Sequence, residues 1–328
     1  MKTAVFTAAT KSYAYALREC AEHLARGLKH SKDEFLWIIA TDKSDTAAEA
    51  VKAWESFGVG KAKVIETGVE EGERKYKEQS QLVISMLQQA CMDEAVKWGA
   101  DLFFSVESDI LIHPESYATL KWVLEYPSSP GYDVAAATYF NGAFLCGRGT
   151  PQHNICEDFL EEERNVPAKL KEDIAKAKKQ IQSGKGDEEL QKKFAELMEE
   201  LKKTPPKGNV FWANSKKWRR RGWLDAAYPG AASQGSVLPS DWCGLGCTLW
   251  GRDVMEVTNF TGYDGRGTQD LFLVWSKWRP AGKRIGCPVG VPACHVKMAD
   301  GKRILWEPFF VPAPEETEGH IRVRQKPI

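Results

Sequence analysis

The stretch of sequence that decides the fold is DLFFSVESD, residues 101–109. Its first six residues are mostly apolar, which is typical of a strand that is buried on both faces of a sheet. The stretch then ends in two acids, Glu107 and Asp109. Because ligands bind at the carboxyl ends of the strands in open α/β sheets, we expect both carboxylates to lie at a binding edge.

Strand and helix patterns alternate on both sides of this stretch. Short apolar runs typical of strands occur at residues 3–7, 35–40, 62–65, 134–137 and 284–291. Helical patterns separate them, and the clearest is the three- and four-residue spacing of apolar positions from Leu17 to Leu28. Repeated βα units imply a mostly parallel sheet with helices on both faces. The sequence therefore predicts an α/β fold.

The composition narrows the class of protein. The 328 residues include 45 Lys plus Arg and 45 Asp plus Glu, so a nucleic-acid or anionic-lipid partner would need a local basic patch. No apolar run approaches the roughly 20 residues that cross a bilayer. The eight cysteines are scattered, as reduced thiols are, and the first residues lack the apolar segment of a signal peptide. We expect a cytoplasmic protein without a membrane span.

The chain is expected to divide into four parts. Residues 1–150 contain most of the βα units, and residues 209–311 form the second half of the same domain. Between them, residues 151–208 form a charged helical hairpin insertion, because 24 of the 47 residues in 157–203 are charged and the apolar ones follow a narrow seam. This insertion is either a solvated arm or a mobile lid. The Pro- and Glu-rich residues 312–328 are expected to form a loosely held tail.

The two acids that end the buried strand have more than one interpretation. Carboxylate oxygens in this position suit Mg²⁺ or Mn²⁺, which proteins bind through one or two carboxylates plus substrate phosphates. The same acids equally suit the cap of the following loop or helix. A zinc site is a further alternative that depends only on the number of candidate ligands, which are Cys243, Cys247, Cys287, Cys294 and His295.

Three other segments carry polar residues at the ends of predicted elements. The segment DKSD at residues 42–45 follows a predicted strand, although Asp and Ser also suit a helix cap. In GTQDL, residues 267–271, Asp270 begins a predicted helix whose dipole favours its ionised form. His295 follows the last predicted strand, where a structural role is the simpler alternative.

The order of these elements and motifs resembles the GT-A fold, a Rossmann-like fold of nucleotide-diphospho-sugar transferases, and in particular the family 2 glycosyltransferases. The resemblance covers nearly the whole chain outside the insertion and the tail. It implies that residues 1–150 bind a nucleotide sugar and that residues 209–311 form the acceptor-side and catalytic half. The implied activity is metal-dependent transfer of a sugar from a nucleoside diphosphate sugar, with UDP as the commonest nucleotide, to an acceptor hydroxyl.

The resemblance also implies roles for individual residues. Glu107, Ser108 and Asp109 stand where the family has its D-x-D motif, and Asp109 matches the final, metal-binding acid. His295 matches a histidine that completes the metal site in many members, with Mn²⁺ or Mg²⁺ as the ion. The remaining contacts to the nucleotide sugar are implied for Thr7, Asp42, Ser44, Asp45 and Arg74.

The catalytic acid of the family matches Asp270. As a base, Asp270 would take the proton of the acceptor hydroxyl and give inversion at the anomeric carbon, whereas in a retaining enzyme it would only orient the substrate. Asp241 and Asp264 are rival bases, because both lie in the same glycine- and aromatic-rich region. The sequence departs from the family at Glu107, which replaces an Asp, and at Gln269, where an acid often precedes the catalytic Asp.

Two aromatic segments suggest the acceptor side. Residues 216–223, KKWRRRGW, interleave bases such as Arg221 with aromatics such as Trp218, which suits phosphate contact and ring stacking. They would hold the diphosphate of the donor, or a nucleic acid or another phosphorylated acceptor, or form only a solvated basic edge. Trp242 and Gly244 lie in WCGLG, which is similar to the glycine-containing loop on the acceptor side of the family.

Two other functions stay open. A transferase-like fold could bind a sugar or a nucleic acid without turnover, although the acids Asp109 and Asp270 together with His295 argue against a decayed site. A nucleotidyltransferase shares the sheet and the need for a metal, but it normally has a glycine-rich, basic loop after the first strand. Residues 7–11, TAATK, do not form such a loop.

Overall fold

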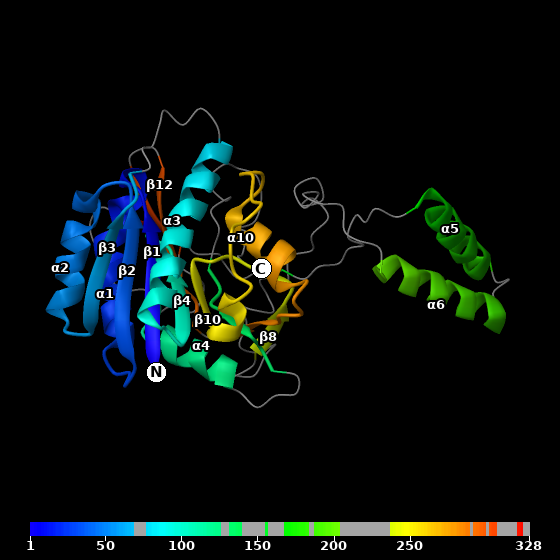
Figure 1. Cartoon of the computed structure of the whole chain (residues 1–328), viewed down its shortest axis with the longest axis horizontal. Helices are drawn as coiled ribbons and strands as arrows, with labels where there is room; N and C mark the ends of the chain where they lie inside the picture. Colours follow the sequence, from blue (N-terminus) through cyan, green and yellow to red (C-terminus); the bar gives the residue numbers. More distant parts are fainter. Residues whose placement is uncertain are drawn as a thin grey trace. The chain divides into compact units, whose positions relative to one another are not determined.

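The computed structural model of the chain divides into two compact units, Met1–Asp158 with Arg219–Ile328, and Phe159–Trp218, and each unit is described by itself. The residues that the structure describes are 1–68, 77–125, 131–139, 155–156, 167–183, 187–203, 237–288, 291–299, 302–306 and 320–323. Figure 1 shows the elements of both units.

The larger unit contains an eight-stranded sheet. Its strands, in spatial order, are β3 (Gly60–Glu66), β2 (Glu34–Thr41), β1 (Lys2–Ala9), β4 (Leu102–Val106), β10 (Cys247–Gly251), β6 (Val134–Ala136), β11 (Ile285–Pro288) and β8 (Val237–Ser240). The first four run parallel, as do β6 and β11, whereas β10 and β8 run antiparallel to their neighbours. The order 3-2-1-4 matches the first four positions of the Rossmann order 3-2-1-4-5-6, so the predicted mostly parallel α/β sheet is confirmed and is consistent with a GT-A fold.

Helices cover both faces of this sheet. One face carries α1 (Leu17–Leu28), α2 (Ala48–Ser56) and α4 (Ser116–Glu125), and the other carries α3 (Lys77–Trp98), α10 (Gln269–Leu273) and the π-helical segment η5 (Val274–Trp278). On the first face Trp37 is fully buried and donates its indole N–H to Thr7. On the second face the Trp250 ring lies 5.4 Å from the rings of both Phe6 and Trp278. Large buried aromatic rings therefore anchor both helical layers.

A second, four-stranded sheet joins the end of β4 to the last part of the chain. Its order is β14 (His320–Val323), β13 (Lys302–Trp306), β12 (Cys294–Ala299) and β5 (Ile110–Leu111). The strand β12 runs antiparallel to β5 and β13, and β14 runs parallel to β13. Because β14 lies within residues 312–328, at least these four residues of the expected loose tail are paired through their backbone.

The smaller unit contains two helices, α5 (Ala168–Gln182) and α6 (Glu188–Lys203). The buried side chains of α5 are Leu170 and Ala177, seven residues apart and hence on one face, while the charged residues around them are mostly exposed. The two predicted helices of the charged insertion are therefore present. A solvated arm and a lid both stay predictions for this unit.

The remaining elements are short. They are η1 (Lys11–Ala16), η2 (Ser44–Ala47), α9 (Arg252–Met255) and the paired strands β7 (Ile155–Cys156) and β9 (Trp242–Cys243). Within the described ranges, no helix has both the length and the apolar character that crossing a bilayer requires. No pattern in the sequence predicted β10, which inserts between β4 and β6 and runs antiparallel to both.

Candidate active site

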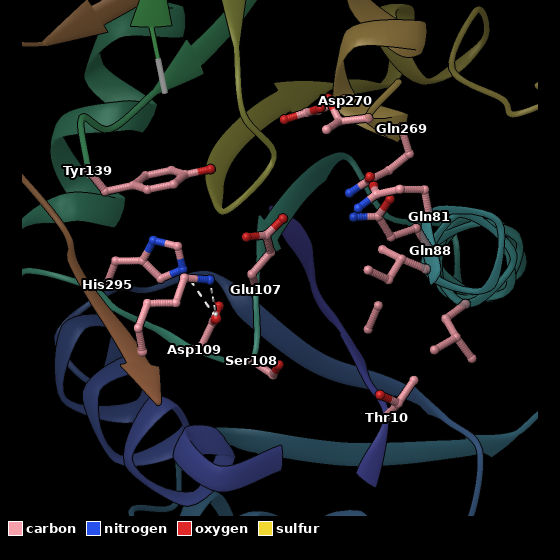
Figure 2. A pocket seen from close by; sticks show the side chains of 15 residues that line it. Thr10, Gln81, Gln88, Glu107, Ser108, Asp109, Tyr139, Gln269, Asp270 and His295 are labelled. Carbon is pink, nitrogen blue, oxygen red and sulfur yellow. Dashed lines mark hydrogen bonds and ion pairs between the residues drawn. The ribbon is translucent and has the colours of Figure 1, made fainter. Parts of the chain in front are cut away.

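A pocket opens where β1 and β4 end, between the first residues of α10, the strand β12 and one face of α3. Figure 2 shows this pocket from close by. Its lining residues are Ala8, Thr10, Gln81, Ile84, Leu87, Gln88, Glu107, Ser108, Asp109, Tyr139, Thr268, Gln269, Asp270, His295 and Lys297. The predicted metal ligands and the predicted base therefore line one pocket at the carboxyl edge of the parallel strands.

Asp109 is the most densely contacted carboxylate of the pocket. Its Oδ2 atom lies 3.2 Å from His295 Nε2, 3.0 Å from Lys297 Nζ and 3.2 Å from the Tyr15 hydroxyl. Burial by itself raises the pKa of Asp109, but the neighbouring His295 and Lys297 outweigh this effect and hold the pKa well below its usual value. Asp109 is consequently ionised at neutral pH.

The second sheet explains how the chain brings these residues together. The strand β5 begins directly after Asp109 and pairs with β12, so that Ile110 stands opposite His295. In addition, the Val296 N–H donates to the Asp109 carbonyl at 2.8 Å. Alternate residues of a strand point to the same face, which explains why His295 and Lys297 both reach the Asp109 carboxylate.

Glu107 completes an acidic cluster. Burial, followed by the charges of Asp109 and Asp270, raises the pKa of Glu107 to about 8, although Lys297 opposes this effect. One ligand atom each from Glu107, Asp109 and His295 lies within 4.8 Å of the others. Carboxylates and an imidazole are ligands that Mn²⁺ and Mg²⁺ accept, and Glu107 would release its proton when a cation binds. These residues therefore fit a divalent cation, beside a lysine that already supplies one positive charge.

Asp270 lies across the pocket from this cluster (Figure 2). It is 7% exposed and accepts the Leu271 N–H at 2.8 Å. Burial raises its pKa to about 6, while hydrogen bonds from Thr268 and the Leu271 backbone lower it. The rival bases Asp241 and Asp264 are exposed and do not line the pocket, and Asp264 pairs with the Arg266 side chain at 3.0 Å instead.

Tyr139 forms the wall of the pocket behind His295. Its ring lies edge-on to the His295 ring at a centroid distance of 5.6 Å, and its hydroxyl accepts the Gly246 N–H at 3.0 Å. A Cβ atom on Gly246 would lie 2.6 Å from that hydroxyl oxygen, so only glycine fits at this position. Gly246 also accepts the Glu107 N–H, which ties the wall to the acidic cluster.

The residues that the resemblance assigned to the nucleotide lie in several different places. Ser108 lines the pocket, whereas Thr7 is buried in the core, and Thr10 rather than Thr7 reaches the pocket from the end of β1. Asp42 accepts the Lys11 N–H at 3.3 Å and so lies beside the end of β1. The other assigned residues give less information, because Asp45 is exposed on η2 and both the Ser44 side chain and Arg74 lie outside the described residues.

The predicted acceptor side is only partly described. Trp242 is 7% exposed on β9, and the Gly244 carbonyl accepts the Thr248 hydroxyl at 2.8 Å, so both residues belong to the packed interior rather than to the pocket lining. Trp218, Arg221 and the whole basic segment 216–223 lie outside the described residues. The cysteines of the alternative zinc site form no metal-binding group among the described residues.

No motif in the sequence predicted several of the residues that line or border the pocket. Lys297 could have been inferred from the strand alternation that starts at His295. Gln81 and Gln88 are seven residues apart and hence share one face of α3, with mostly apolar residues between them. Tyr15 and Tyr139 carry no local signal, because tertiary pairing alone brings them to the site.

The comparisons with known proteins give distant similarities. No protein-family model and no curated protein matches the chain. Among solved structures, the chain is similar to A197 from STIV, with 11% identity, a TM-score of 0.42 and coverage of 97% of this chain and 100% of that chain. It is also similar to S. aureus TarS 1-349 in complex with UDP-GlcNAc, with 19% identity, a TM-score of 0.33 and coverage of 48% and 39%. Similarity at this level does not assign a function to the chain.

Proposed function

We propose that the protein is a glycosyltransferase that uses Mn²⁺ or Mg²⁺ and moves a sugar from a nucleoside diphosphate sugar to an acceptor hydroxyl. The observation that supports this proposal is that Asp109, Asp270 and His295, from three distant segments, line one pocket at the carboxyl edge of the parallel strands. The resemblance of their motifs to those of GT-A enzymes is independent support.

The diphosphate would leave on the side of the pocket that carries the acidic cluster. Asp109 and His295, with Glu107, would hold the divalent cation, and the cation would neutralise the negative charge that grows on the departing diphosphate. Lys297 donates one N–H of its ammonium group to the same carboxylate, and the other two N–H groups could donate to phosphate oxygens. The Asp109 carboxylate thus orients two positively charged groups toward the leaving group.

Asp270 is the proposed base. Its pKa of about 6 leaves it mostly ionised at neutral pH, yet basic enough to take a proton from an attacking hydroxyl. Because Asp270 and the cluster around Asp109 lie on opposite sides of the pocket, the acceptor would attack from the side away from the leaving diphosphate. This arrangement gives inversion at the anomeric carbon. Asp42, beside the end of β1, would contact the nucleoside, for which uridine is our first expectation.

A screen of nucleotide sugars tests the proposal. UDP- and GDP-linked sugars are incubated with the protein and Mn²⁺, and release of the nucleoside diphosphate is measured with water and with added sugar acceptors. We expect release from at least one donor that depends on Mn²⁺ and on Asp270. Tight binding without release, even with acceptors, would favour a non-catalytic binding module. Release of sugar 1-phosphate, from cleavage between the two phosphates with transfer of the nucleotidyl group, would favour a nucleotidyltransferase.

A further inference from the structure

Three glutamines form a neutral side of the pocket. Gln81 and Gln88 come from α3, and Gln269 is the first residue of α10. Figure 2 shows their carboxamide ends turned toward one another, with Glu107 between them and the pair Asp109–His295. The pocket therefore has a charged side and an amide side.

The carboxamide oxygens of the amide side are buried, and none of them has a hydrogen-bond partner among the residues that the structure describes. Gln88 is 2% exposed and Gln269 is 4% exposed. The Oε1 atoms of both residues, and that of Gln81, are buried and accept no hydrogen bond from any residue in the described part of the chain. Because buried polar groups in proteins are almost always paired, three neighbouring unpaired amide oxygens in one pocket indicate that a ligand supplies their partners.

The neighbouring Gln89 shows what a structural glutamine looks like in the same helix. Its Nε2 donates to Asp93 at 2.8 Å, and its Oε1 accepts the Phe260 N–H at 3.1 Å. The chain therefore pairs both ends of the glutamine that does not line the pocket.

The chemistry of the glutamines restricts the ligand. An amide carries no charge, so it cannot compensate a phosphate or a carboxylate, and its oxygen needs a donor while its nitrogen needs an acceptor. A hydroxyl group supplies both. The group that best matches three converging amides is therefore an uncharged part of the ligand that carries several hydroxyls close together.

We propose that Gln81, Gln88 and Gln269 bind the hydroxyl groups of the sugar that the nucleotide donor carries. This inference rests on the proposed function. In that function the anomeric carbon lies between the leaving diphosphate near Asp109 and the base Asp270, so the sugar ring extends over Glu107 toward the amide side. A nucleobase, which also carries donors and acceptors, is the competing occupant that the experiment must exclude.

The experiment compares Gln88→Met with the matched control Gln89→Met. Methionine has nearly the length and volume of glutamine without its amide. Calorimetry with Mn²⁺ gives the affinity for UDP and for UDP-glucose, UDP-galactose and UDP-N-acetylglucosamine. For Gln88→Met we expect unchanged affinity for UDP and about tenfold weaker binding of the preferred UDP-sugar. Gln89→Met should bind both like the wild type.

The melting temperature of the ligand-free protein is a second readout that does not depend on the nucleotide. Gln88→Met should raise it, because the variant removes a buried, unpaired carbonyl, whereas Gln89→Met should lower it, because the Phe260 N–H loses its acceptor. A lower melting temperature for Gln88→Met would show that the Gln88 amide is structural and would overturn the inference.

The remaining outcomes separate the inference from the proposed function. Equal losses of UDP and UDP-sugar affinity in Gln88→Met would mean that the glutamines hold the nucleoside, which overturns the inference alone. A wild-type protein that binds neither UDP nor any UDP-sugar would overturn the proposed function, and the sugar assignment with it.

Discussion

His295 Nε2 lies 3.2 Å from Asp109 Oδ2, although the two residues come from distant parts of the chain. Backbone pairing between β5 and β12 brings the two residues together, and the Val296 N–H adds a hydrogen bond to the Asp109 carbonyl. The same pairing brings Lys297 to the carboxylate. The site is thus held by a small sheet rather than by loops alone, which is the kind of rigid support that a preorganised site needs.

Asp270→Asn should slow transfer strongly and spare donor binding. The amide keeps the shape of the side chain but cannot take the proton from the attacking hydroxyl of the sugar acceptor. We therefore expect kcat to fall by about 10²–10⁴-fold. Steady-state kinetics gives kcat, and calorimetry gives the donor affinity. The matched control is Asp264→Asn, which changes an exposed rival acid. Normal turnover in Asp270→Asn, or its loss in Asp264→Asn, would reassign the base.

The pH dependence of the rate should report Asp270. A base must be ionised to act, and its pKa is about 6, so kcat/KM should rise tenfold per pH unit below about pH 6 and level off above it. Initial rates between pH 4.5 and 8 at low donor concentration measure this. A profile that falls as the pH rises through 6 contradicts an Asp base.

Lys297→Met should tighten the binding of Mn²⁺ to the ligand-free protein. The Lys297 ammonium lies 3.0 Å from Asp109 and repels a cation that approaches the same oxygen. Relief of only about 1.4 kcal/mol of repulsion corresponds to a tenfold gain in affinity. Electron paramagnetic resonance of free Mn²⁺ during a titration measures the affinity of the protein for Mn²⁺.

The matched control for this measurement is Lys63→Met. Lys63 pairs with Glu94 at 2.6 Å and does not line the pocket, so its removal should leave Mn²⁺ affinity unchanged. Weaker Mn²⁺ binding in Lys297→Met would mean that Lys297 supports the cation site instead of competing with it.

Gly246→Ala should destabilise the protein by about 1–3 kcal/mol, because the new Cβ overlaps the Tyr139 hydroxyl and ring. Chemical unfolding measures the free energy of unfolding. In a double-mutant cycle with Tyr139→Leu, the second substitution should cost less in the Gly246→Ala background than in the wild type, because the two residues are in contact. If the two losses in the free energy of unfolding are additive, the alanine side chain introduced at position 246 does not clash with Tyr139.

The fold was largely predictable because its strongest signals are local. The apolar runs that became β1, β2 and β4, and the leucine spacing of α1, depend on period and burial alone. The strand β10 was not predictable, because its antiparallel insertion between β4 and β6 is a choice between sheet neighbours that no local pattern encodes. The two-residue strand β5 is too short to carry any period.

The site was predictable where acids directly follow strands. It was less predictable where the pairing of distant segments determines which residues reach the pocket. Glu107 and Asp109 are predictable because they end a buried apolar strand, whereas Asp270 is predictable only from the resemblance of its segment to the family motif. The resemblance predicts a nucleotide contact for Thr7, but the Thr7 hydroxyl accepts the indole N–H of Trp37 in the core. Strand residues alternate between faces, and a one-residue difference in register separates a core residue from a pocket residue.

The most direct test of the central claim is calorimetric titration of UDP and GDP with and without Mn²⁺, in the wild type, in Asp109→Asn and in the control Asp93→Asn. Asp93 is exposed on α3 and accepts only the Gln89 amide in the described structure. We predict that a nucleoside diphosphate binds the wild type and Asp93→Asn more tightly with Mn²⁺, and that Asp109→Asn loses this gain. Nucleotide affinity that does not change with Mn²⁺, or a Mn²⁺-dependent gain in affinity that Asp109→Asn keeps, would contradict the account.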